Sequence, residues 1–212
     1  MDAYLVPQRS DEWKSLRLGK VTASRVADII AKTKSGWSSS RANSMADLIA
    51  ERLTGCPSNR IFVTPAMQHG IDTEEEARRY YETKTGVKVQ EIGFAPHPKI
   101  PYSGASPDGL AGDGLLEIKS PLTATHIDTL LGQNVPSKYI TQIQWQLACS
   151  GLEWCDFVSY DPRLPESMKC FIQRVNRDQP MIENLEKSVI EFLAELDEKL
   201  KALKDMYEEV EV

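Results

Sequence analysis

The stretch from Ser106 to Pro121, SPDGLAGDGLLEIKSP, constrains the fold more than any other part of the chain. The segments YSGASPDGL and LLEIKS have the composition of short strands, and AGDG between them favours a tight turn, so the stretch predicts an antiparallel hairpin. Apolar residues at 115, 116 and 118 indicate that the second strand is buried. Glu117 and Lys119 are costly to bury there without a partner. The chain is therefore expected to hold a charged group inside a sheet.

This hairpin is expected to bring oxygen ligands together. Asp108, near the end of the first strand, can lie opposite Glu117 on the second, and Glu117 and Lys119 share a face because strand side chains alternate. Ile118 then points into the core, while its backbone carbonyl can face the acids. Two carboxylates and a carbonyl form a hard, oxygen-only site that suits Mg²⁺ or Mn²⁺ better than zinc. Lys119 beside it would hold a water or stabilise charge on an attacked phosphate.

Two other interpretations compete for the same stretch. A calcium loop of the D-x-[DN]-x-[DN]-G type ends in Glu at its twelfth position, but Leu110, Gly112 and Lys119 occupy the third, fifth and twelfth positions here, so this interpretation fails. The second is a plain hairpin with charged surface residues. It stays open, although the burial expected around Glu117 argues against it.

The composition is that of a globular protein with local charge asymmetry. Of its 212 residues 41% are hydrophobic, which is enough for one substantial domain, 1–212. No apolar run approaches the ~20 residues that span a membrane, and the first residues lack the features of a secretion signal.

The charge is distributed unevenly along the chain. The net charge of −6 argues against nucleic-acid binding, but residues 1–41 have a net charge of +4 and residues 183–212 a net charge of −6. This asymmetry leaves room for a local phosphate site. The four cysteines form no C-x-x-C pair, which favours free thiols in a reducing cytoplasm.

The periodicity along the chain predicts a fold of the α/β (α+β) class, with a central mixed β-sheet flanked by helices. The polar segment TKSGWSSSR reads as a flexible loop. Strands are expected at VKVQEIGFA, in the hairpin above, and at CDFVSYDP and MKCFIQRV. Helices are expected at 22–32, 42–54, 71–85, 137–150 and, as a long charged helix, at about 180–207.

The residues Pro107-Asp108 and Glu117-Ile118-Lys119 resemble the signature of the PD-(D/E)xK nucleases. That signature is short, but other motifs extend the match: WKSLRLGKVTASRV, HGIDTEEEAR, SPDGL, LEIKSP, TQIQWQL and YDPR. Their order and approximate spacing are similar to those of the phage lambda-type exonucleases, which belong to the YqaJ-like viral recombinase group. The resemblance covers roughly residues 10–200 and implies a PD-(D/E)xK nuclease core.

The resemblance also implies an activity and its partners. Such an enzyme is a deoxyribonuclease that digests one strand of linear double-stranded DNA from the 5′ end with Mg²⁺, releases 5′-mononucleotides and leaves a 3′ single-stranded overhang for recombination. It works as a ring-shaped homotrimer around DNA, alongside a phage single-strand annealing protein. It would be encoded by a phage or prophage and act in the cytoplasm of the bacterial host.

Roles for single residues follow from the same resemblance. Asp108, Glu117 and the Ile118 carbonyl match metal ligands, Lys119 matches the catalytic lysine, and Glu74 completes a second metal position. Two ions in the site would activate the water and steady the leaving oxygen. Lys34 matches a minor-groove contact and Met67 an apolar wedge that splits the terminal base pairs. A pocket for the terminal 5′-phosphate is matched by Arg17, Ser24, Ser106 and Gln142. Without the resemblance, the sequence favours ordinary surface or helix-face positions for Arg17, Glu74 and Gln142.

Two other functions remain open on the sequence. One is a PD-(D/E)xK endonuclease of the restriction or repair type, which would cut a circular plasmid. The other is a non-catalytic DNA-end-binding subunit. Against the second, every chemical position of the motif carries a competent residue.

Overall fold

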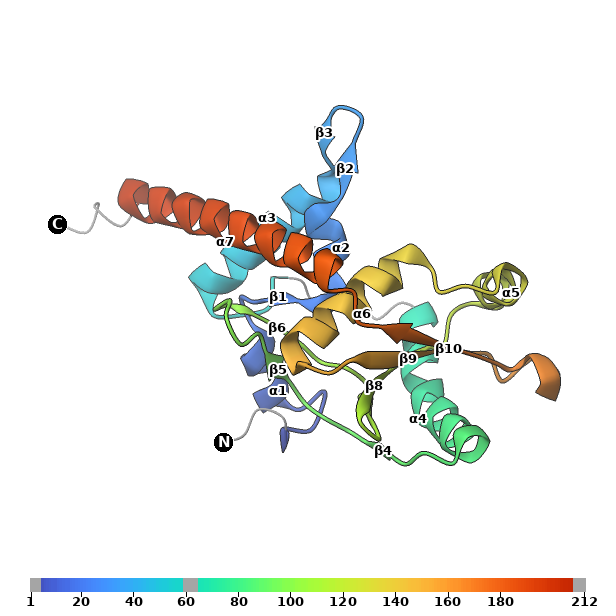
Figure 1. The fold of residues 1–212 in the computed structure, drawn as a ribbon. Coiled ribbons are helices and arrows are strands. Elements are labelled where there is room, and N and C mark those ends of the chain that lie inside the picture. Colours follow the sequence, from blue (N-terminus) through green and yellow to red (C-terminus); the bar gives the residue numbers. More distant parts are fainter. Residues whose placement is uncertain (1–4, 59–64, 208–212) are drawn as a thin grey trace.

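The computed structural model describes residues 5–58 and 65–207, with side chains from residue 68 onward in the second range. Its centre is a five-stranded mixed sheet in the order β10-β9-β8-β7-β4 (Figure 1). Strand β8 runs parallel to β9, and the other neighbours in this sheet are antiparallel. The strands are β4 (Val89–Gln90), β7 (Gly109–Ala111), β8 (Gly114–Lys119), β9 (Trp154–Tyr160) and β10 (Cys170–Asn176).

Helices cover both faces of this sheet. On one face, Ala77 and Tyr81 of α4 (Pro65–Thr85) pack with Leu116 and Ile118 of β8. On the other face, Ile143 and Leu147 of α6 (Ser137–Ser150) pack with Leu115 of β8. Alternation along β8 therefore turns Glu117, which follows Leu115 by two positions, toward α6. Between β8 and α6 lies α5 (Thr123–Gly132), and η2 (Glu166–Met168) precedes β10.

A second layer is built from both ends of the chain. Helix α7 (Gln179–Tyr207) packs on α2 (Ala23–Ile30) and α3 (Ser39–Thr54) around a shared apolar core, and its last turns extend beyond the body (Figure 1). Beneath them lies a small sheet in the order β1-β6-β5. Its strands are β1 (Val21–Thr22), β6 (Ser103–Ala105) and β5 (Ala95–Pro96), and helix α1 (Asp11–Arg17) precedes it in the chain.

The predicted charged hairpin is present as β7 and β8. Gly112, at the tip between them, has φ +65°, and a glycine at the first turn position is what this tight hairpin connection requires. Gly114 is equally constrained, since a Cβ there would lie 2.2 Å from the Trp154 ring. Asp108 precedes β7, and its backbone N–H donates to the carbonyl of Leu116 across the pair. The hairpin thus fixes Asp108 beside β8.

Several predicted elements differ in extent. The expected strand VKVQEIGFA divides into β4 and β5, which belong to different sheets, because Ile92 and Phe94 are buried while the chain crosses between the sheets. The expected strand YSGASPDGL likewise divides into β6 and β7 around Pro107, which lacks the N–H needed for a ladder. Helices α3 and α4 begin earlier than predicted, at Ser39 and Pro65, and α1 and α5 were not expected.

The expected loop TKSGWSSSR is partly ordered. It contains the hairpin of β2 (Lys32–Thr33) and β3 (Gly36–Trp37), which projects from the body (Figure 1). Trp37 explains the order, because both Lys32 and Arg41 stack over its ring, at 4.6 and 4.1 Å from the centroid. None of the helices within residues 5–58 and 65–207 combines the length and apolar content that crossing a membrane requires.

Candidate active site

Glu117 is the most enclosed acid of the predicted cluster, with 1% of its surface exposed. Two amides from successive turns of α6 donate to its carboxylate. Gln142 Nε2 lies 2.5 Å from Oε1, and Gln146 Nε2 lies 2.5 Å from Oε2. The ammonium group of Lys119 forms an ion pair with Oε1. Glu117 is therefore held in one orientation by donors to both of its oxygens.

Asp108 reaches the same strand from the other side of the hairpin. Its Oδ2 accepts a hydrogen bond from the backbone N–H of Ile118 at 2.6 Å. Burial raises the pKa of Asp108 well above its usual range, and repulsion from Glu117 adds to the rise, while Lys119 opposes it. Burial alone would lower the pKa of Lys119, but the Glu117 and Asp108 carboxylates outweigh it and raise that pKa. The site thus carries more buried negative charge than Lys119 can balance.

These groups meet at a cleft of about 620 Å³. Asp108, Ile118 and Lys119 line it on one side, and Glu74 of α4 lines it on the other. Glu74 forms an ion pair with Arg9 and a second with Arg78, at 3.3 Å. The rest of the lining is Gly70, Ile71, Ser120, Pro121, Lys138 and Tyr139. Asp108, Ile118 and Glu74 therefore converge on the cleft, whereas Glu117 is buried behind its lining and pairs with Lys119 there.

The donor set fits a divalent cation. Its ligands would be oxygens from Asp108, Glu117 and the Ile118 carbonyl, as Mg²⁺ and Mn²⁺ prefer. Burial, and then repulsion from Glu117, raise the pKa of Asp108, and a bound cation would favour its ionised form. No group of three or more His, Cys, Asp or Glu side chains that could hold a metal ion occurs in the described part of the chain.

A second, basic hollow of about 200 Å³ lies at α1 and α2. Arg17 lines it and donates from Nη1 to Ser106 Oγ at 2.9 Å. Trp13 donates from Nε1 to the same oxygen at 3.0 Å, and the Arg17 guanidinium lies over its ring. Because Ser106 Oγ accepts both bonds, its own O–H is left to donate outward. Ser106 is two residues from Asp108, so this hollow adjoins the carboxylate site.

The hollow is suited to an anion. Besides Arg17, its lining includes Lys14, Lys20 and Arg25, against one acid, Glu51. Burial lowers the pKa of Arg17 to about 10, and the nearby positive charge of Arg25 adds to this, so the guanidinium remains charged at neutral pH. Arg25 pairs with Glu51 and Lys14 with Asp11, each at 2.8 Å, so Arg17 and Lys20 are the cations of the hollow whose charge a bound phosphate would balance.

Comparisons with known proteins identify the family of the chain. A sequence profile of the YqaJ-like viral recombinase domain matches residues 12–153. The chain belongs to the YqaJ-like viral recombinase family. The alkaline exonuclease LHK-Exo of Laribacter hongkongensis, solved alone and in complex with dAMP, is 48% identical, with a TM-score of 0.88 over 95% of this chain and 100% of that one. This match confirms the predicted PD-(D/E)xK nuclease fold.

Two more distant proteins are also similar to this chain, one in fold and one in sequence. A phage-related exonuclease from Haemophilus somnus 129PT superposes with a TM-score of 0.69 over 87% of this chain and 96% of its own, and at 14% identity it supports the fold alone. The uncharacterized protein R354 of Acanthamoeba polyphaga mimivirus is 26% identical over 196 residues, which are 85% of this chain and 33% of that protein. The chain spans about a third of the length of that curated relative.

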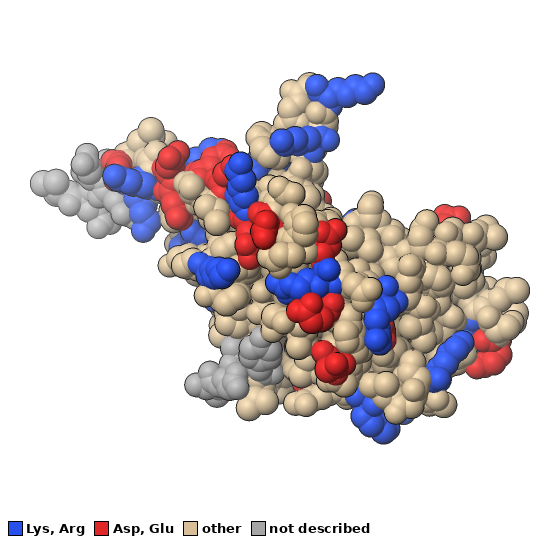
Figure 2. Space-filling view, viewed as in Figure 1, with Lys and Arg blue, Asp and Glu red and all other residues tan. Residues whose placement is uncertain are grey.

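The remaining predicted residues of this YqaJ-like domain lie in different places. Ser24 is exposed in the first turn of α2, and its hydroxyl is 3.4 Å from that of Thr22, which lines the basic hollow. Gln142 does not join Arg17 and Ser106 in any described hydrogen bond and instead contacts Glu117. Lys34 is exposed at the turn between β2 and β3, on an arm that Figure 2 shows with basic side chains. Met67 lies in α4, but its side chain is outside the described residues.

Sequence reasoning missed Gln146, Trp13 and Arg25. A signal for Gln146 was available, because it stands one helical turn after Gln142 in a segment that is otherwise rich in apolar residues. Trp13 carried none, since its partner Ser106 is 93 positions away.

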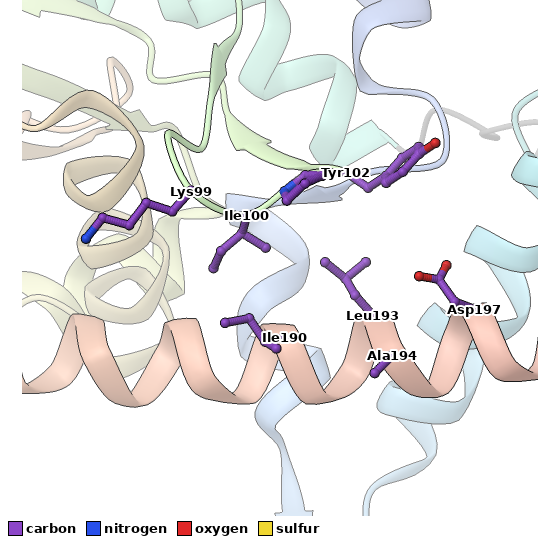
Figure 3. A pocket seen from close by; sticks show the side chains of 8 residues that line it. Lys99, Ile100, Tyr102, Ile190, Leu193, Ala194 and Asp197 are labelled. Atoms are coloured by element: carbon purple, nitrogen blue, oxygen red, sulfur yellow. The ribbon is translucent and has the colours of Figure 1, made fainter.

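A third hollow, of about 420 Å³, is of a different kind. It lies between the loop at residues 99–102 and α7, where Ile100 and Leu193 face each other (Figure 3). The single acid in its lining, Asp197, pairs with Arg52 at 2.6 Å. With no second carboxylate, it lacks the chemistry of the cleft at Asp108.

Proposed function

We propose that this deoxyribonuclease is a Mg²⁺-dependent 5′-to-3′ exonuclease that acts on the ends of linear double-stranded DNA. It releases 5′-mononucleotides and leaves a 3′ single-stranded overhang. The observation that carries the proposal is the adjacency of two sites through one short segment: Ser106 accepts a hydrogen bond from Arg17 of the basic hollow, and Asp108, two residues later, lines the carboxylate cleft.

The cleft supplies the chemistry of phosphodiester hydrolysis. Asp108, Glu117 and the Ile118 carbonyl would hold a divalent ion, which would supply the charge that makes water nucleophilic, and Glu74 would assist a second ion. Lys119, with 26% of its side chain exposed, is charged and lines the cleft, so it stabilises the negative charge that develops on the attacked phosphate. The two glutamines keep Glu117 oriented throughout.

The basic hollow determines the direction of digestion. A carboxylate site treats both strands alike, so a group beside it must select the end. Arg17 and the outward hydroxyl of Ser106 would bind a terminal 5′-phosphate, with Ser24 at the margin. Gln142 acts from the carboxylate side, through Glu117. When the terminal 5′-phosphate is bound in the hollow, the first phosphodiester linkage lies beside Asp108. Each cleavage then releases one 5′-mononucleotide. The crystallisation of the relative LHK-Exo with dAMP, itself a mononucleotide, supports this outcome.

The proposed assembly reconciles the acidic chain with DNA. Acidic side chains gather along α7, whereas Lys34 stands on the projecting arm (Figure 2). A ring-shaped homotrimer with a basic lumen would confine DNA contact to its channel. Met67 would act there as a wedge, and a phage single-strand annealing protein would use the overhang in the cytoplasm of the bacterial host. Sedimentation at micromolar concentration is expected to give a trimer, and a 23.8 kDa monomer would contradict it.

End-labelled duplexes test the polarity. In Mg²⁺, a label at the 5′ end should be released first, as a mononucleotide, while a label at the 3′ end of the same strand should stay in acid-insoluble DNA until late in the digestion. Early release of the 3′ label, or release of labelled oligonucleotides, would overturn the proposal in favour of the opposite polarity or of an endonuclease.

A further inference from the structure

The cleft at Asp108 continues past the acids to a basic rim that the proposed chemistry does not use. Lys138 and Tyr139, in the first turn of α6, form this rim with Ser120, which directly follows the last residue of β8. Lys119 lies between the rim and the acids. The cleft is therefore acidic where the linkage is cut and basic on one side of that point.

Lys138 is exposed, and its charge is not neutralised by a neighbour. Among the described residues it forms no ion pair, and the first turn of α6 contains no acid. Its Nζ lies over the ring of Tyr139, 4.7 Å from the centroid. That ring is fixed in turn, since it stacks on Phe157 at 5.4 Å and faces Lys119 at 5.3 Å. Lys138 thus presents an available cation at a defined place on the rim.

Ser120 adds an unused donor at the same rim. Its hydroxyl oxygen is buried and has no hydrogen-bond partner among the described residues, although the residue lines the cleft. A buried hydroxyl without a partner is unfavourable, and an acceptor entering the cleft would satisfy it. A cation and a hydroxyl donor together suit an anionic oxygen ligand, and in a DNA cleft that ligand is a backbone phosphate.

We propose that Lys138 and Ser120 bind the phosphate that follows the scissile one on its 3′ side, in the strand being digested. This inference rests on the proposed function, because the order of sites sets the direction. Arg17 of the basic hollow contacts Ser106, which lies ahead of Asp108 and β7, whereas the rim is reached through Lys119 and Ser120 at the end of β8. A strand whose terminal phosphate occupies the hollow passes Asp108 and leaves over the rim. Lys138 is thus a substrate-positioning residue that keeps the strand in register for the next cleavage.

A substrate with one neutral linkage tests the pairing. A 5′-phosphorylated, 5′-labelled duplex carries a methylphosphonate at the second linkage, and release of the first nucleotide is timed in Mg²⁺ against the unmodified duplex. Wild type should slow by roughly three- to tenfold on the modified duplex, as expected for one lost charged contact. Lys138→Gln should be slowed by a similar factor on the unmodified duplex and show no further loss on the modified one. Ser120→Ala should show a smaller version of the same pattern.

The matched control is Lys187→Gln, which changes an exposed lysine on α7 outside both sites and should behave as wild type on both duplexes. A Lys138→Gln enzyme that is as fast as wild type, or that loses the same further factor on the modified duplex, overturns the inference. Failure of the proposed function would look different, because wild type would then release no 5′ nucleotide even from the unmodified duplex.

Discussion

Replacing Gln146 by Met should lower the catalytic rate while leaving the stability of the fold nearly unchanged. Gln146 is fully buried, and its Nε2 donates to Glu117 Oε2 at 2.5 Å. Its other polar atom, Oε1, is buried with no partner among the described residues. Methionine keeps the unbranched shape but removes both polar atoms, so the substitution deletes one good hydrogen bond and one unsatisfied acceptor together.

The two effects on stability oppose each other. A hydrogen bond to a charged group contributes about 1.5–3 kcal/mol, and an unpaired buried acceptor costs about 1–3 kcal/mol. The centres of the two ranges differ by less than about 1 kcal/mol, so the free energy of unfolding should change little, with a shift in Tm of no more than about 2–4 °C in a chain of this size. Catalysis has no such offset, because Glu117 loses the donor that orients one of its oxygens. Loss of an outer partner of a metal ligand costs about 10- to 100-fold in activity or metal affinity.

Gln144 on the same helix is the matched control. Its Nε2 donates to the Asn176 carbonyl at 2.8 Å, and its Oε1 accepts from the backbone N–H of Asp178 at 2.9 Å, so neither polar atom serves Glu117. Gln144→Met leaves two backbone groups unpaired, so Tm should fall by at least about 4 °C while folded enzyme keeps near wild-type activity.

The assay pairs thermal unfolding with nucleotide release from a linear duplex over a range of Mg²⁺ concentrations. Gln146→Met should retain Tm, lose rate and need more Mg²⁺ for half-maximal activity. Activity within twofold of wild type would refute the orienting role of Gln146. A fall in Tm as large as that of Gln144→Met would refute the reasoning about its unpaired oxygen.

Three further predictions concern the phosphate hollow, a buried histidine and the choice of ion. Wild type should digest a 5′-phosphorylated duplex roughly 10- to 150-fold faster than a 5′-hydroxyl duplex, and Arg17→Ala should erase most of this preference; equal wild-type rates would contradict the phosphate site. Burial lowers the pKa of His97, although its Nε2 lies 3.2 Å from Glu186 Oε1, and its Nδ1 accepts hydrogen bonds from two backbone N–H groups. The unfolded chain therefore binds this proton more readily than the folded protein. The free energy of unfolding should fall as the pH drops below about 6.5. His97→Gln should flatten Tm between pH 7 and 5, and an unchanged slope would exclude His97 as the cause. Ca²⁺ should support DNA binding without turnover, since it accepts oxygen ligands but activates water poorly; rapid digestion in Ca²⁺ alone would count against a metal-activated water.

The carboxylate cluster could be predicted from the sequence because its geometry is local. Asp108, Glu117 and Lys119 belong to one hairpin, so strand alternation and a tight turn are enough to bring them together. The long helices at residues 137–150 and 180–207 were equally accessible, since the periodicity of each extends over many turns.

Contacts between distant segments could not be predicted in the same way. Periodicity shows which face of an element is buried but not which element covers it, so the pairing of Gln146 with Glu117, 29 positions away, was not visible. The resemblance assigned Gln142 to the phosphate, whereas the packing of α6 on β8 gives it Glu117 as its partner. The expected strand at residues 87–95 failed for a related reason, because its alternation reflects packing in two separate sheets.

The most direct test of the central claim compares linear with covalently closed circular duplex DNA in Mg²⁺, for wild type and for Glu117→Gln. Wild type should release acid-soluble nucleotides from the linear duplex and leave the circle intact. Glu117→Gln should release none from either while still binding linear DNA, because Glu117 serves the ion and Gln142 and Gln146 can still hold a glutamine oxygen. Cutting of the circle by wild type, or near wild-type digestion by Glu117→Gln, would contradict an end-dependent nuclease built on these carboxylates.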